Sequence, residues 1–147
     1  MARSMIAVIV GYVAMFVLVF VTFTVVFLVM GVEWSFKPKS FEASTAWVTM
    51  SLIGNFVIGV VGGLICTVIS RGGKAPVILA IVVFALGLLL AIPAVIAHKQ
   101  NTGEVRTGNV SQTEAMTKAI EPVWVPFAFP FICTAGVVLG GKLKRGS

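Results

Sequence analysis

Long apolar segments separated by short polar ones dominate the pattern along this chain. Four of them extend over residues 5–32, 46–70, 75–97 and 123–141, and none contains Asp, Glu, Lys, Arg or His. A helix needs about 20 apolar residues to cross the hydrocarbon core of a bilayer. Strands of a membrane barrel would instead alternate in hydropathy with a period of two. The sequence therefore predicts an all-α membrane protein, a four-transmembrane-helix bundle.

The composition supports this class and limits the domain organisation. Of the 147 residues, 59% are hydrophobic and only 11% are charged, so the chain needs lipid as its solvent. Four spans leave no room for a separate soluble domain, and we expect residues 1–147 to form a single integral membrane domain. The run over residues 5–32 is far longer than the roughly 7–15 residues of a signal-peptide core, so we expect it to be retained.

The cations predict the orientation of the bundle. Between the spans lie a short turn, residues 71–74, and two longer loops, residues 33–45 and 98–122. If the spans alternate, one side holds Arg3, Arg71, Lys74, Lys142, Lys144 and Arg145 in short segments. The other side holds the remaining cations together with all five acidic residues. The excess of cations in short segments predicts that both termini are cytoplasmic, and we expect a bacterial cytoplasmic (plasma) membrane.

The net charge of +6 also bears on partners. Anionic lipid headgroups at the cytoplasmic face are the expected partner of the clustered cations. A nucleic-acid partner is not expected, because the basic residues are too scattered to form a continuous basic surface.

Aromatic residues gather where the spans meet the longer loops. Trp34, Trp47 and Trp124 are predicted interfacial anchors, since an indole ring favours the headgroup layer. Phe36, Phe41, Phe127 and Phe129 extend this rim. The alternative is a ligand cage built from the same rings, but the sequence groups no acidic residue with them. A second aromatic set, Phe16, Phe20, Phe23 and Phe27, shares one sector of the first span and is expected to face lipid or a second subunit.

Both longer loops contain recognisable local signals. Lys37-Pro38-Lys39 predicts a turn. Ser111-Gln112-Thr113-Glu114 has the capping-box pattern and predicts a short helix that ends before Pro122.

A stripe of small and polar residues follows one face of the second span, within a sector of roughly 120° at about 100° per residue. Its members are Ser51, Asn55, Gly59, Gly62, Gly63, Cys66 and Ser70. Similar stripes occur in the first span (Ala7, Gly11, Ala14, Thr22), the third (Ala80, Gly87, Ala91, Ala94) and the fourth (Cys133, Gly136, Gly140). Small residues at a spacing of four allow helices to approach closely, so helix packing is the main expectation. A polar pore lining is the alternative, and the packing itself can occur within one chain or in a homo-oligomer.

The sequence offers no reactive constellation. Cys66 and Cys133 are expected to be free, buried thiols, because no Cys-x-x-Cys motif is present. The spacing of His98, Glu104, Glu114 and Glu121 matches no ligand motif. We therefore predict no catalytic residue, no metal site and no cofactor.

Three functional classes follow, in order of expectation. The first is a non-catalytic accessory, scaffold or assembly subunit of a membrane complex, with a homo-oligomer or a larger complex as its setting. The second is a passive channel or carrier for a small neutral solute, in which Ser51, Asn55 and Ser70 would line the path. A membrane enzyme is third. Proton-coupled transport is not expected, because the spans contain no ionisable residue.

Overall fold

A computed structural model describes residues 2–71, 73–101, 103, 105–108 and 110–145. In these residues the chain forms five helices: α1 (Ala2–Ser35), α2 (Thr45–Ser70), α3 (Ala75–Asn101), α4 (Gln112–Lys118) and α5 (Val125–Arg145). Four of them, α1, α2, α3 and α5, are long and apolar enough to cross a membrane. The predicted all-α, four-span class is thereby confirmed.

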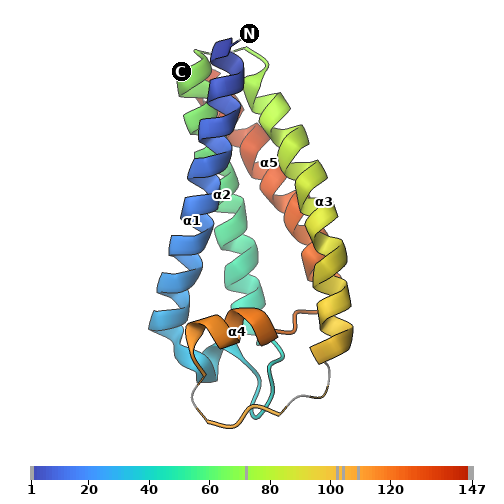
Figure 1. The fold of residues 1–147 in the computed structure, drawn as a ribbon. Helices are drawn as coiled ribbons and strands as arrows, with labels where there is room; N and C mark the ends of the chain where they lie inside the picture. The colour runs from blue at the N-terminus through green and yellow to red at the C-terminus, as the bar shows by residue number, and fades with distance from the viewer. Residues whose placement is uncertain (1, 72, 102, 104, 109, 146–147) are drawn as a thin grey trace.

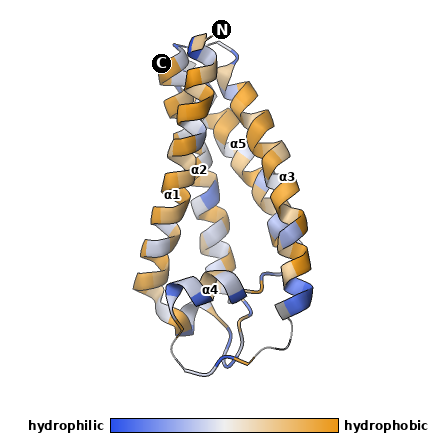
Figure 2. Ribbon diagram, in the orientation of Figure 1, coloured by the Kyte–Doolittle hydropathy of each residue, from blue (hydrophilic) through white to orange (hydrophobic). Residues whose placement is uncertain are grey.

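The four long helices run side by side, with both termini at one end and the two longer connections at the other (Figure 1). We refer to these as the termini end and the loop end. Hydrophobic residues cover most of the length of the four helices, whereas hydrophilic residues collect in α4 and at the last turn of α3 (Figure 2). This distribution is the one that a bilayer around the long helices requires.

The observed helices extend beyond the apolar segments that predicted them, except at the start of α5, which lies at Val125 rather than at residue 123. α1 starts at Ala2 and continues to Ser35, with a break at Gly31, whose φ is +72°. α3 continues to Asn101 rather than ending at residue 97, and α5 extends from Val125 to Arg145 rather than over residues 123–141. Hydropathy locates the part of a helix that lies in lipid, whereas backbone hydrogen bonds continue into polar residues.

The segment between α1 and α2 forms the predicted turn. The amide of Lys37 donates to the carbonyl of Glu42 at 2.9 Å, and the amide of Ser40 donates to the carbonyl of Lys37 at 3.2 Å. Ser44 then caps α2, because its side chain accepts a hydrogen bond from the amide of Trp47 at 3.1 Å.

The predicted short helix is also present, as α4. Its N-cap is Ser111, whose hydroxyl accepts from the amide of Glu114 at 3.3 Å, and it ends at Lys118, before Pro122. α4 lies across the loop end between α1 and α3 (Figure 1). The side-chain amide of Gln112 donates to the hydroxyl of Thr24 at 2.7 Å, which ties α4 to α1.

Hydrogen bonds join the two loops into one layer over the loop end. The amide of Ala43 donates to Ile120, and the amide of Ile120 donates to Phe41, at 2.8 and 2.9 Å. The guanidinium of Arg106, whose side chain is 4% exposed, pairs with the carboxylate of Glu33 at 3.0 Å. This layer fixes the entrances of α2 and α5.

Candidate functional site: two cavities at the loop end

The small-residue stripe of α2 forms contacts within this chain. Methyl groups built on Gly59 and Gly63 would collide with the carbonyl oxygens of Cys133 and Val137 in α5. From the other side, methyl groups on Gly136 and Gly140 would collide with carbonyl oxygens of α2. The two backbones are therefore in direct contact, as small residues at this spacing permit.

Other members of the stripe face different neighbours. Gly62 lies against Met15 of α1, and Cys66 is buried near Gly11 of the same helix. Ser70, at the termini end, donates to the carbonyl of Thr67 in its own helix at 3.3 Å. The stripe is thus divided between α5 and α1.

The polar members of the stripe are far from equivalent. Ser51 is 2% exposed, and its hydroxyl has no hydrogen-bond partner among the described residues. The side-chain amide of Asn55 donates to the carbonyl of Phe129 in α5 over 3.5 Å, which is a long hydrogen bond. Ser70 bonds to its own helix, so Ser51, Asn55 and Ser70 share no common hydrogen-bond partner.

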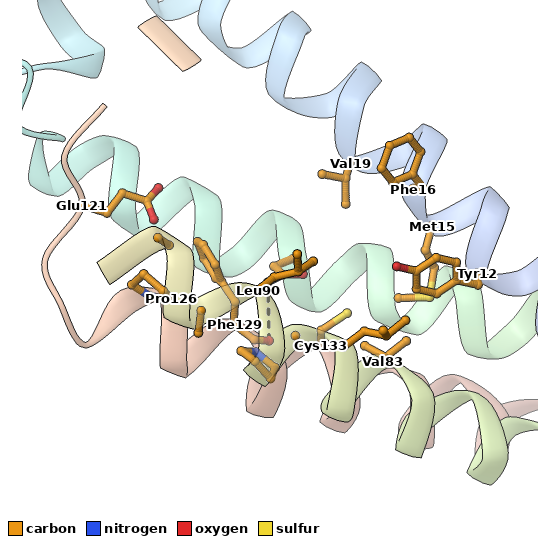
Figure 3. Close-up of a pocket in the computed structure, with 16 residues that line it drawn as sticks. Tyr12, Met15, Phe16, Val19, Val83, Leu90, Glu121, Pro126, Phe129 and Cys133 are labelled. Carbon is orange, nitrogen blue, oxygen red and sulfur yellow. Dashed lines mark hydrogen bonds between the residues drawn. The ribbon is translucent and has the colours of Figure 1, made fainter. Parts of the chain in front are cut away.

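Where α1 and α3 separate toward the loop end, they leave a cavity of about 310 Å³, which we call the α1–α3 cavity. Its lining is apolar apart from three side chains, Tyr12, Asn55 and Glu121. Phe16 and Leu90, on its two rims, are 66% and 64% exposed, so the cavity opens sideways between the helices. Glu121 lies at one end of this row of side chains and Tyr12 at the other (Figure 3).

Beneath α4 lies a second cavity of about 180 Å³, the α4 cavity. Its wall contains five aromatic residues: Phe23, Phe27, Phe36, Trp47 and Phe129. The Trp47 ring lies 5.9 Å from the Phe23 ring and 6.2 Å from the Phe27 ring, measured between centroids. Phe23 and Phe27 therefore do not simply face lipid or a second subunit, whereas Phe16 and Phe20 are more than half exposed.

Glu121 and Phe129 line both cavities, so the two spaces meet at these residues. Burial raises the pKa of the Glu121 carboxyl above its ordinary value near 4.5. Among the described residues no cation pairs with this carboxyl. The sequence groups no acidic residue with the aromatic rim, but the fold places Glu121 in the same cavity wall as Trp47.

The three predicted anchors now differ in their surroundings. Trp34 and Trp124 are 69% and 56% exposed at the loop end, where an interfacial ring would lie. Trp47 is only partly exposed, and its ring packs on α1. It also lines the α4 cavity, so its surroundings differ from those of the two exposed anchors.

The remaining candidate residues do not converge. Cys66 and Cys133 are both free and buried, as predicted. Glu114 pairs with Lys118 at 3.4 Å on the exposed side of α4, and Glu104 lies outside the described residues. Among the residues that the structure describes, no group of three or more His, Cys, Asp or Glu side chains is placed to hold a metal ion.

The cavities are the part of the site that sequence reasoning missed. Tyr12, Phe129 and Glu121 belong to three segments, and no spacing rule connects them. One signal was present: Glu121 is the last charged residue before the fourth span, directly preceding Pro122. Comparison with models of known families, with curated proteins and with solved structures finds no match to this chain.

Proposed function

We propose that the protein is a non-catalytic accessory or assembly subunit of a membrane complex, with both termini in the cytoplasm. The observation that carries this proposal is the uneven burial of the spans. In the most apolar stretch of α1 only 11% of the residues are buried, against 33 to 39% in the other three spans. α1 is thus the helix with the largest surface left for a partner.

An exposed strip of α1 residues outside the lining of the α1–α3 cavity is the proposed contact. Val13, Val17 and Phe20 are 53%, 52% and 55% exposed and follow one another at helical spacing. A transmembrane helix of a different membrane protein is the proposed occupant. The glycine stripe of α2 is not available for such a contact, because its closest approaches are already made to α5.

Affinity purification of the full chain in mild detergent tests this proposal. We expect a stoichiometric membrane-protein partner, which Val17→Trp releases. Val57→Trp is the matched control, because Val57 is 51% exposed on α2. Recovery of the chain alone or as a homo-oligomer would refute the heteromeric role, and equal capture by both variants would exclude this face of α1.

The orientation is tested by thiol labelling in intact cells. Lys39→Cys and Thr113→Cys, at the loop end, are expected to react with an impermeant reagent, whereas Lys74→Cys, at the termini end, is not. The native Cys66 and Cys133 give little background because both are buried. Labelling of Lys74→Cys would reverse or reject the orientation.

A passive carrier is the second candidate, because Asn55 lines the α1–α3 cavity and provides an amide within the membrane. In this case Asn55→Ala remains folded and changes the flux of a small neutral solute through reconstituted vesicles. For an accessory subunit, Asn55→Ala lowers stability by about 0.6 kcal/mol or less, since membrane side-chain hydrogen bonds are weak. Flux equal to that of protein-free vesicles would rule out the carrier.

A further inference from the structure

The α1–α3 cavity has the shape and the lining of a site for one apolar chain. Along α3 its lining extends from Val83 to Ala94, about 16 Å at about 1.5 Å per residue. Its volume of about 310 Å³ is at the lower limit of the roughly 300–1,000 Å³ of ligand pockets. Because the rims at Phe16 and Leu90 are exposed, a chain can enter from the surrounding lipid.

The α4 cavity has the chemistry of a site for an ammonium group. Phe23, Phe27 and Trp47 present aromatic rings to it, and Trp47 is within about 6 Å of both others, centroid to centroid. Aromatic rings that surround a small cavity attract cations through their negative faces. Glu121 supplies a carboxyl at the junction with the apolar cavity.

The surroundings of the Glu121 carboxyl indicate that a cation bound beside it would come from outside the chain. A partly buried carboxylate is stabilised by a positive charge within about 4–6 Å, and no described cation of the protein pairs with Glu121. Lys118, the nearest cation in sequence, instead pairs with Glu114 and lies 5.4 Å from the Phe41 ring. An ammonium bound between Glu121 and the aromatic wall would complete the charge pair.

We propose that the two cavities form one binding site for a phospholipid of the surrounding bilayer that carries an ammonium headgroup. The ammonium occupies the α4 cavity beside Glu121 and Trp47, and one acyl chain occupies the α1–α3 cavity. The two ends of the site match the two ends of such a lipid, since the charged end lies at the loop end, where Trp34 and Trp124 are also exposed, and the apolar end lies within the spans.

The dimensions favour a lipid chain over a helix of another protein. A helix with its side chains is about 10 Å across, so a segment as long as the cavity would need several times 310 Å³. α4 also lies across the loop end, and its bond from Gln112 to Thr24 keeps it next to α1. A single chain can pass below this bridge, whereas a helix reaching the loop end would displace it.

The test uses the full chain, reconstituted in nanodiscs of phosphatidylethanolamine and phosphatidylglycerol in equal amounts. A trace of phosphatidylethanolamine with a photoactivatable group on one acyl chain is added, and the cross-linked residues are identified by mass spectrometry. We expect cross-links at residues of the α1–α3 cavity such as Val19 and Leu90. A phosphatidylglycerol probe with the same acyl chain is expected to cross-link there about tenfold less, which is typical of losing one charge-assisted contact.

Two pairs of variants separate the two parts of the site. Ala94→Trp fills the loop-end part of the cavity and is expected to abolish the cavity cross-links, whereas Ala85→Trp, at an exposed position on the opposite face of α3, preserves them. Glu121→Gln is expected to lower the phosphatidylethanolamine signal about tenfold and to leave the phosphatidylglycerol signal unchanged. Glu114→Gln, on the exposed side of α4, changes neither.

The following results would overturn the proposal. Equal cavity cross-linking by the two probes would show that the headgroup is not selected, and equal cross-linking in Ala94→Trp and Ala85→Trp would show that the chain lies outside the cavity. A loss of both signals in Glu121→Gln, together with a lower unfolding temperature, would assign Glu121 a structural role only. Each result is independent of whether α1 has a protein partner.

Discussion

Two sides of this bundle use small residues in different ways. Between α2 and α5, Gly59 faces Gly136 and Gly63 faces Val137 so closely that no side-chain atom fits between the backbones. Between α1 and α3 the small residues at the termini end are buried, whereas Ala94 at the loop end lines an open cavity. The same type of stripe therefore produces a closed contact in one place and a ligand-sized space in another.

The difference depends on what stands opposite each stripe. Gly59 of α2 meets Gly136 of α5, and Gly63 and Gly140 each lie against the backbone of the other helix, so α2 and α5 stay in contact over this stretch. Gly87 of α3 faces α5 rather than α1 and meets the ring of Pro130, whose nearest atom would lie 2.7 Å from an added methyl carbon. Beyond this contact α3 diverges from α1, and α4 bridges the gap (Figure 1). A stripe of small residues allows another helix to come close, and the residue that faces the stripe determines how far along the helix the two backbones stay in contact.

The largest effect is expected at the α2–α5 contact. Gly59→Ala and Gly63→Ala each place a methyl group against a backbone carbonyl, which cannot move away as a flexible side chain would. We expect each to destabilise the bundle by about 3 kcal/mol or more, at the upper part of the range for overpacking. Reversible unfolding in mixed detergent micelles measures the change.

Gly54→Ala is the matched control, because it lies on the same helix and the nearest atom to an added methyl group is 3.9 Å away, in Thr22. This variant is expected to be neutral or up to about 1 kcal/mol more stable, as alanine favours helix. Equal stability of all three variants would contradict the closed contact between α2 and α5.

A smaller effect is expected where α4 bridges the open side. Gln112→Ala removes the 2.7 Å bond to Thr24 and should cost about 1 kcal/mol, the usual net contribution of one hydrogen bond. Hydrogen exchange in α4 should rise, while exchange in α2 and α5 stays unchanged. Thr113→Ala, at the neighbouring exposed position, controls for the change in helix propensity. Faster exchange in α2 would show that the two sides are coupled.

Much of the fold follows from local signals in the sequence. Apolar runs without charge predict the four spans, Lys37-Pro38-Lys39 predicts the turn, and Ser111 with Glu114 predicts α4. Each of these signals lies within one segment and depends on hydropathy or on hydrogen bonds between near neighbours. They were confirmed for this reason.

The site could not be predicted in the same way. Glu121 approaches Trp47 only because hydrogen bonds join Ile120 to Phe41 and Ala43, and these bonds connect two loops that are far apart in sequence. The cavity between α1 and α3 depends on where the two helices separate, which no single stripe determines. Pairing between distant segments, rather than the composition of any one segment, brings the carboxyl and the rings together.

The smallest effects are expected from two loop-end carboxyls whose pKa values shift in opposite directions. A hydrogen bond from Lys37 at 2.6 Å, and the charge of that lysine, lower the pKa of the exposed Glu42 below its ordinary value near 4.5. Folding therefore favours the ionised form, and the contribution of Glu42 to stability is present above pH 4.5 and is lost as the pH falls through the lowered pKa. Glu42→Gln should lower the free energy of unfolding by an amount close to the limit of measurement, because water screens the exposed pair of Lys37 and Glu42.

The pKa of Glu121 shifts in the opposite direction, because burial raises it, and folding therefore favours the protonated form. Its stabilising contribution is present below pH 4.5 and is lost as the pH rises through the raised pKa. In detergent without ammonium lipid, Glu121→Gln should therefore unfold at a higher temperature than the unmodified protein at pH 8, and at the same temperature at pH 4. Adding phosphatidylethanolamine should stabilise the unmodified protein at pH 8 more than the variant, because only the carboxylate pairs with the ammonium. A Glu121→Gln protein that is less stable at both pH values would show that contacts within the chain already offset the burial of this carboxyl. The open side between α1 and α3 would then carry no uncompensated charge at the loop end, and in this respect it would not differ from the closed contact between α2 and α5.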